Sequence, residues 1–287
     1  MIYIAIPSIV LFFLLIPAPA FAWGPATHLE IGEKLLANAA LLAPAVKFFL
    51  DRFPSDFLYG NISADIVVGK NLVEELKHCH NWKMGFRLLK KAKNDPQRAF
   101  AYGYLSHLAA DTIAHNHFIP EMMMRSFRTR MHRHIYWELR FDAMADKRMW
   151  KLPKDIARGV DPGDDLLLDA LIEASPLSFK TNKTIFSSML NLQHVEKWHR
   201  LLDRLSSASK WELHREDKDR FFSLAYEASR DVLTKSHDAR CVKKDPTGRH
   251  NLNSAKFMRK KLKRIRRTGR DWETALDNAL SLVRIDP

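Results

Sequence analysis

The chain has 287 residues, of which 46% are hydrophobic, enough to bury one substantial core or two small ones. Its formal net charge of +13 favours anionic partners such as phospholipid headgroups or nucleic acid. It has only two cysteines, Cys79 and Cys241, so a disulfide framework and a C-x-x-C zinc knot are both excluded, although a single disulfide is allowed.

Residues 1–22 contain no Asp, Glu, Lys or Arg and end in Ala20-Phe21-Ala22, directly before Trp23. An apolar run that closes in A-x-A predicts a secretory signal peptide. The mature protein would then begin at Trp23 and be secreted or periplasmic. The alternative is an uncleaved membrane anchor, because about 20 apolar residues can span a bilayer. Pro17 and Pro19 favour cleavage.

The elements that follow are predicted to be helical. Thr27 and Glu30 form a capping box that opens a helix through Leu36. Asp95 and Pro96 resemble the N-cap and first residue of a second helix, which carries the apolar run Ala99–Ile113 and stops at Pro120. The remaining expected elements are a long amphipathic helix from Met122 to Trp150, a turn at Asp161–Asp164, and helices near 165–174, 184–205, 208–237 and 254–283.

Few runs alternate with a period of two, so the predicted fold class is all-α. We expect residues 23–150 to form a catalytic core. Residues 151–287 would be the helical remainder of the same domain or a basic extension. Within that second half, Lys256–Arg270 is strongly basic. A solvated helix face is the simpler interpretation of this segment, and an electrostatic contact with an anionic membrane or polynucleotide is the functional one.

Two pairs of metal-ligand residues stand four residues apart on the expected helices. His107, Asp111 and His115 would share one helix face, and His134 and Glu138 repeat the spacing. Burying such a polar face costs several kcal/mol unless the groups find partners, and a divalent metal ion is the usual one. The spacing therefore predicts a metal site, with more than one ion.

Three further motifs precede the pairs described above: Trp23-Gly-Pro-Ala-Thr-His28, the turn Gly60-Asn-Ile-Ser-Ala-Asp65 and His80-Asn-Trp82. In that order the motifs resemble the bacterial zinc-dependent phospholipase C family. The glycosylphosphatidylinositol-specific phospholipase D catalytic domain and the fungal zinc single-strand nucleases are relatives of that family. The resemblance covers about residues 23 to 150. It implies a multi-helix bundle with a trinuclear zinc cleft.

The resemblance also implies a set of zinc ligands. Trp23 would donate its free amine and carbonyl to one ion, together with His28 and with Asp111, which bridges to a second ion. That second ion would take Asp65, His80 and His107. The third would take His134, Glu138 and either His115 or His117; helix continuity favours His115, and a break before Pro120 would favour His117. His78 competes with His80, which is preferred because an aromatic residue closely follows it.

The activity implied is a secreted phospholipase C that uses about three zinc ions and a metal-activated water to hydrolyse the glycerol-side phosphodiester of phospholipids. Asp65 is the candidate to orient or deprotonate that water. No protein partner is inferred. One alternative is a zinc-dependent single-strand nuclease or other phosphodiesterase on the same scaffold, and another is a non-catalytic, zinc-stabilised membrane-binding protein. No Gly-rich phosphate loop or serine nucleophile elbow is present to support other chemistries.

Overall fold

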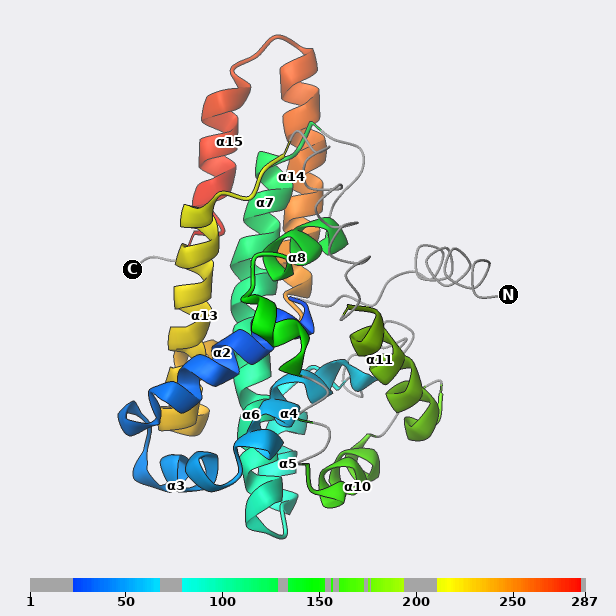
Figure 1. The fold of residues 1–287 in the computed structure, drawn as a ribbon. Helices are drawn as coiled ribbons and strands as arrows, with labels where there is room; N and C mark the ends of the chain where they lie inside the picture. Colours follow the sequence, from blue (N-terminus) through cyan, green and yellow to red (C-terminus); the bar gives the residue numbers. More distant parts are fainter. Residues whose placement is uncertain are drawn as a thin grey trace, which may run out of the picture.

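The computed structural model describes residues 23–67, 79–128, 134–152, 156, 160–172, 175, 177–193 and 211–284, which form helices joined by turns, with no strand among them (Figure 1). The all-α prediction is therefore confirmed. No helix in this part of the chain is long and apolar enough to cross a bilayer. In chain order the elements are α2 (Pro25–Ala37), η1 (Ala39–Leu41), α3 (Pro44–Arg52), α4 (Pro54–Ser63), η2 (Ala64–Ile66), α5 (Trp82–Lys91), α6 (Asp95–Ile113), η5 (Ala114–Phe118), α7 (Ile119–Arg125), α8 (His134–Asp142), η6 (Lys147–Trp150), α10 (Pro162–Leu171), α11 (Phe179–Gln193), α13 (Arg215–Lys235), η7 (Ser236–Asp238), η8 (Arg240–Lys243), α14 (Arg249–Arg267) and α15 (Trp272–Ser281).

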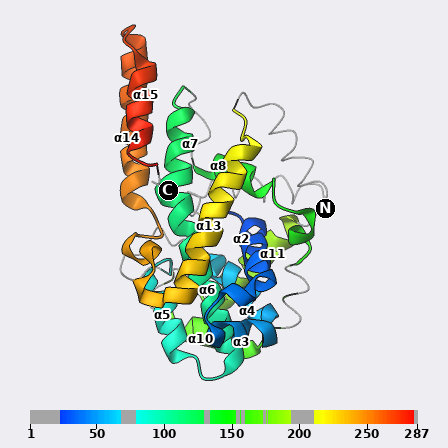
Figure 2. The same ribbon diagram turned by 90° about the vertical axis from the view of Figure 1, so that its left-hand side faces the viewer.

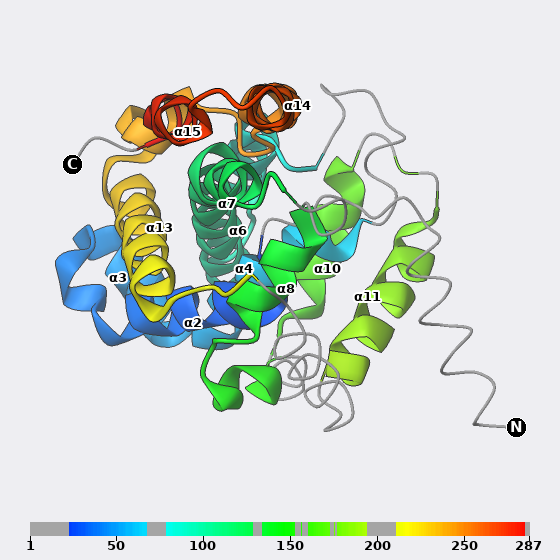
Figure 3. The same ribbon diagram turned by 90° about the horizontal axis from the view of Figure 1, so that it is seen from above.

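The central element is a continuous rod made of α6, η5 and α7. Seen from above, α2, α4, α8, α13 and α14 surround it (Figure 3). Almost every α6 residue from Ala99 onward is buried, as expected for a helix at the centre of a bundle, and its faces are mostly apolar apart from the one that carries His107 and Asp111. The helix begins at Asp95, and its N-cap is Asn94, whose side chain accepts a hydrogen bond of 2.9 Å from the backbone of Gln97. The predicted cap was one residue too late.

The rod does not stop at Pro120, contrary to the prediction. The turn before it, η5, is a π-helix, and α7 continues directly from it. Proline has no N–H for the preceding turn, and its ring crowds the carbonyl four residues earlier, which here belongs to Asn116. Asn251 of α14 donates its side-chain N–H to that carbonyl at 3.0 Å. The wide turn accommodates the Pro120 ring. The carbonyl of Asn116, to which proline cannot donate, accepts a hydrogen bond from α14 instead.

Helices α4 and α6 pack with their backbones in contact. A Cβ atom placed on Gly60 would lie 2.0 Å from the carbonyl oxygen of Phe100, and one on Gly103 would lie 2.0 Å from that of Phe57. No larger side chain fits at either position without the helices moving apart. The segment from Gly60 to Asp65, predicted to be a turn, is the end of α4 followed by η2. The close crossing brings η2 against the middle of α6.

The start of α2 is capped from another helix. The helix begins at Pro25, with Gly24 at the N-cap and no side-chain cap of its own. The predicted capping box is therefore wrong, because Thr27 already lies inside the helix. Its backbone N–H instead donates to the Asp142 carboxylate of α8 at 2.7 Å. This bond ties the beginning of α2 to α8.

The predicted helix from Met122 to Trp150 consists of separate elements. Helix α7 ends at Arg125, residues 129–133 lie outside the described part of the chain, and α8 begins at His134. Likewise, the predicted helix over 254–283 is a hairpin of α14 and α15. Gly269 reverses the chain with a φ of 69°, and the side chain of Asp271 caps α15 by accepting from two backbone N–H groups.

The other predicted helices of the second half are present with shifted bounds. Helix α10 starts at Pro162, where Asp161 is the N-cap, α11 covers the described part of the segment predicted at 184–205, and α13 covers most of 208–237. Residues 194–210 lie outside the described part. Helix α13 lies along α6, where the Ser229 hydroxyl donates to the carbonyl of Ser106 at 3.0 Å.

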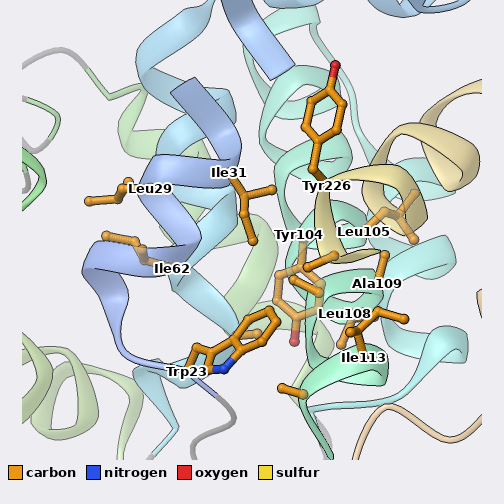
Figure 4. Packing of buried hydrophobic residues seen from close by; sticks show 14 of the residues in the cluster. Trp23, Leu29, Ile31, Ile62, Tyr104, Leu105, Leu108, Ala109, Ile113 and Tyr226 are labelled. Atoms are coloured by element: carbon orange, nitrogen blue, oxygen red, sulfur yellow. The ribbon is translucent and has the colours of Figure 1, made fainter. Parts of the chain in front are cut away.

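The hydrophobic core fills the space between α2, α4, α6 and α13. Trp23, at the start of α2, is fully buried with Leu29 and Ile31, and Leu105 and Leu108 of α6 belong to the same core cluster (Figure 4). The Trp23 ring stacks on Phe141 with centroids 4.4 Å apart. The core thus holds the first residue of the predicted mature chain in a fixed position beside α6 and α8.

Candidate metal centre

The structure brings most of the predicted ligand residues into the interior of the bundle. They come from six places: His28 on α2, Asp65 on η2, His80 just before α5, His107 and Asp111 on α6, His115 and His117 on η5, and His134 and Glu138 on α8. All are buried except His134, whose side chain is 21% exposed. Three groups of these residues have ligand atoms close enough to hold a metal ion: His28, His107 and Asp111; Asp65, His80 and His107; and His115, His134 and Glu138.

Asp111 lies at the centre of the first two groups. Its Oδ1 atom is 3.3 Å from His28 Nε2, and its Oδ2 atom is 3.3 Å from His107 Nε2 and 3.4 Å from His80 Nε2. The His80 Nε2 atom is also 3.2 Å from His107 Nε2 and 3.1 Å from Asp65 Oδ1. One carboxylate therefore faces three imidazoles from three segments of the chain.

These contacts fit metal coordination better than hydrogen bonding. Both oxygens of Asp111 and both ring nitrogens of His28 are buried without a hydrogen-bond partner in the described part of the chain. Orphaned buried polar atoms are costly and call for an explanation such as an ion. Zinc–nitrogen bonds of 2.0–2.1 Å place two ligands of a tetrahedron about 3.3–3.4 Å apart. The contacts around Asp111 fall at this spacing, so the donor set fits zinc.

Backbone carbonyls orient two of the imidazoles. His107 Nδ1 lies 2.8 Å from the carbonyl of Asn61 in α4, and His115 Nδ1 lies 2.7 Å from that of Pro246. A carbonyl only accepts, so each Nδ1 must carry the proton, and the Nε2 lone pair points into the cluster. This arrangement is typical of metal-binding histidines, whose second nitrogen is held by an outer hydrogen bond.

The third group is formed by η5 and α8. His134 Nε2 lies 3.0 Å from Glu138 Oε1, and the His115 ring meets the His134 ring edge-on with centroids 5.0 Å apart. The Nε2 atom of His115 is buried and makes no hydrogen bond to any described residue. The His115 side chain therefore joins this group.

His117 points the other way. Its Nδ1 atom lies 2.7 Å from the carbonyl of Val283, and Lys244 Nζ lies 2.9 Å from its Nε2 atom. Both ring nitrogens are thus engaged with the C-terminal half of the chain. The competing residue His78 lies outside the described part of the chain, whereas His80 joins the cluster.

The charges of the cluster, in the absence of metal, are mutually dependent. Burial alone would raise the pKa of Asp111, but the imidazoles of His107 and His28 hold it well below its usual range. Burial opposes protonation of His107, yet the Asp111 carboxylate raises its pKa, whereas burial and the charge of His107 lower that of His28. Burial also lowers the pKa of His115, which favours the neutral imidazole that metals require.

Both cysteines are buried, and no disulfide joins them. Cys79 Sγ lies 3.3 Å from His80 Nδ1 and 3.5 Å from the carbonyl of Ala64. Burial raises the pKa of Cys241 to about 12. The thiol of Cys79 thus contacts Nδ1 of the candidate ligand His80, whereas Nε2 of His80 faces Asp65 and Asp111.

A protein-family model for zinc-dependent phospholipase C matches residues 27–174. The chain belongs to this family. No curated protein and no solved structure matches it. The resemblance inferred from the motifs is thereby confirmed, and family membership supports zinc as the metal and phospholipase C-type hydrolysis of phosphodiesters as the activity.

Sequence reasoning did not identify the groups that hold the ligands in place. The carbonyls of Asn61 and Pro246 and the carboxylate of Asp142 do so, and two of these are backbone atoms, which no side-chain pattern reveals. Asp142 stands four residues after Glu138, so helical spacing could have placed it on the same face.

Proposed function

We propose that the mature protein is a secreted or periplasmic phospholipase C that hydrolyses the glycerol-side phosphodiester of phospholipids with about three zinc ions. The observation that carries this proposal is the buried Asp111 carboxylate, which has no hydrogen-bond partner among the described residues and is surrounded by three imidazoles. Family membership gives the class of reaction. The apolar segment 1–22 supports export.

The three ions would be held by three sets of ligands, two of which share one residue. His28 and Asp111 would hold the first, and Asp65, His80 and His107 the second, with Asp111 shared between them. His115, His134 and Glu138 would hold the third. We assign His115 rather than His117 to this site, because the nitrogens of His117 are engaged elsewhere. The first ion has only two side-chain ligands, so it needs further donors.

The amine and carbonyl of Trp23 would supply those donors. The Trp23 ring is fixed against Phe141. The next residue, Gly24, has Asp142 so close that a Cβ there would lie 2.2 Å from a carboxylate oxygen. Zinc binds unprotonated nitrogen, and a chain-internal amide is a poor donor. Signal cleavage would therefore complete the site.

Bound zinc would neutralise the phosphoryl oxygens, lower the pKa of a water molecule and stabilise the departing alkoxide. The chain's own contribution is to hold the ligands rigidly and to move a proton. In this proposal the carboxylate of Asp65 would accept a proton from the attacking water. Water oxygen bonds to phosphorus, the bond from phosphorus to the glycerol oxygen breaks, and diacylglycerol and a phosphorylated headgroup leave.

The test is headgroup release from mixed phospholipid vesicles by protein that begins at Trp23, with and without a zinc chelator. We expect release that the chelator abolishes and added zinc restores. His80→Gln should lose it, whereas His250→Gln, at an exposed histidine of α14, is the matched control and should retain it. If zinc-loaded protein releases no headgroup but cleaves single-stranded DNA, the nuclease alternative replaces this proposal. If it cleaves neither, zinc has a structural role.

A further inference from the structure

Helix α14 lies outside the segment matched by the family model and carries an unusual charge. Its sequence, RHNLNSAKFMRKKLKRIRR, contains nine Lys and Arg residues and no Asp or Glu. With α15 it forms a hairpin that extends beyond the end of α7 (Figure 2). Like charges on one helix repel one another, so this composition favours an anionic partner.

Three of these basic residues share one face of the helix with an aromatic side chain. Phe257, Lys260, Lys261 and Arg264 are three or four residues apart, so they lie on one side of the helix, and all are exposed. We call these four residues the basic face. Phe257 is 67% exposed. The opposite side is buried through Leu252, Ala255, Arg259 and Leu262, so the hairpin has no need of Phe257 for its own packing.

Among the described residues, none neutralises the charges of the basic face. No carboxylate in the described part of the chain pairs with Lys260, Lys261 or Arg264. The acidic residues of the hairpin, Asp271, Glu273 and Asp277, belong to α15 or its cap. Three unpaired cations and an exposed phenyl ring complement an anionic, partly apolar surface, which is the chemistry of the headgroup region of a bilayer.

The hairpin is fixed to the candidate metal centre at its base and braced near its tip. Asp245 and Asn251 bind Asn116, and the carbonyl of Val283 binds His117, so both ends of the hairpin contact η5. Near the tip, the Trp272 ring packs on Phe127 with centroids 5.6 Å apart. The hairpin is therefore a rigid extension of the element that carries His115.

We propose that the basic face docks the protein on anionic phospholipid bilayers. The proposal rests on the proposed function only in taking membrane phospholipid as the substrate. A helix with basic residues and an exposed aromatic side chain can lie in the interface, with the ring entering the acyl boundary and the cations meeting lipid phosphates. A single aromatic on the face favours lipid over single-stranded nucleic acid, which stacks its successive bases on several rings.

The experiment measures binding of the full mature, zinc-loaded protein to vesicles of phosphatidylcholine, with and without phosphatidylglycerol. We expect binding only when phosphatidylglycerol is present, weakening with salt. Each basic residue near such a surface contributes about fivefold, so the triple variant K260Q/K261Q/R264Q should bind on the order of 100-fold more weakly. F257S should also weaken binding, by loss of the inserted ring.

The matched control is K90Q/K91Q/K93Q, which removes the same charge from exposed positions at the end of α5 and just beyond it. It should bind like the unmodified protein, and zinc content and circular dichroism should be unchanged in all variants. Binding by the triple variant equal to that of the control would overturn the proposal, as would tighter binding to single-stranded DNA than to the anionic vesicles. The readout is binding to the vesicles and not product release. A protein that binds the vesicles but hydrolyses no phospholipid would therefore count against the proposed activity alone.

Discussion

Replacing Asp111 by Asn tests whether one carboxylate serves two metal ions. The two oxygens of Asp111 face different imidazoles, His28 on one side and His107 with His80 on the other, at 3.3–3.4 Å. Asparagine has nearly the same shape but no charge, and its NH₂ group cannot coordinate a metal. We expect the variant to lose zinc from both of these sites and to retain it at His115, His134 and Glu138.

The expected loss of zinc affinity is estimated by dividing the zinc-binding free energy equally among the ligands. Structural zinc sites bind with about 10–16 kcal/mol, so one of four ligands contributes on the order of 3 kcal/mol, which is about 100-fold in affinity. After dialysis at a fixed free zinc concentration that saturates the unmodified protein, the Asp111→Asn protein should therefore contain about one ion. Headgroup release should be almost abolished, since the remaining ion lies in the third group.

The assay is zinc content per protein molecule, with thermal unfolding as a check on folding. The matched control is Asp164→Asn, which changes another fully buried carboxyl group, in a separate acidic cluster that includes Asp56. This control should keep its full zinc content. An Asp111→Asn protein with the unmodified zinc content and normal turnover would refute the shared role of Asp111.

Three further predictions concern residues around the centre and the fold. One additional residue before Trp23 should remove one zinc ion and most activity, and full zinc loading of that extended protein would exclude the amine as a ligand. Burial, with Asp56 nearby, raises the pKa of Asp164 to about 9, so the folded chain holds a proton that the unfolded chain releases above about pH 4. The free energy of unfolding should then fall as pH rises between about 4 and 9. Asp164→Asn should flatten this dependence and stabilise the protein by up to about 4 kcal/mol at neutral pH, as measured by urea titration. Gly103→Ala should cost about 1–3 kcal/mol or more, because its Cβ would meet the Phe57 carbonyl at 2.0 Å, and an unchanged unfolding midpoint would show that α4 and α6 separate freely.

Local spacing predicts the parts of the candidate centre that lie within one helix. His107 with Asp111, and His134 with Glu138, are four residues apart, so a helix alone places each pair together. His28, Asp65 and His80 come from separate elements, and only the family resemblance could assign them to the same place. Their approach depends on the contact of α4 with α6 at Gly60 and Gly103, which is a tertiary feature.

The ends of the elements were predicted less well, for identifiable reasons. Proline inside a helix usually ends or kinks it, so the sequence predicts a stop at Pro120. The wide η5 turn makes room for the ring, and Asn251 of α14 binds the carbonyl that proline leaves without a partner. The α14–α15 hairpin was predicted as one helix because apolar spacing continues through it. The sequence does contain a glycine that can reverse the chain, Gly269, and an N-cap residue for the next helix, Asp271. The break between the two helices could therefore have been predicted.

The choice between His115 and His117 depends on the half of the chain that carries no recognised motif. In a regular α-helix His115 would follow Asp111 by one turn, but the wider π turn alters the direction of both histidines. The carbonyl of Pro246 accepts a hydrogen bond from His115 Nδ1, and Lys244 and the carbonyl of Val283 engage His117. Gly248, at a φ of 56°, allows this loop to approach, since a Cβ there would lie 2.5 Å from the His115 carbonyl oxygen. The C-terminal half therefore selects which histidine faces His134 and Glu138, and it is part of the metal centre although none of its side chains is a proposed ligand.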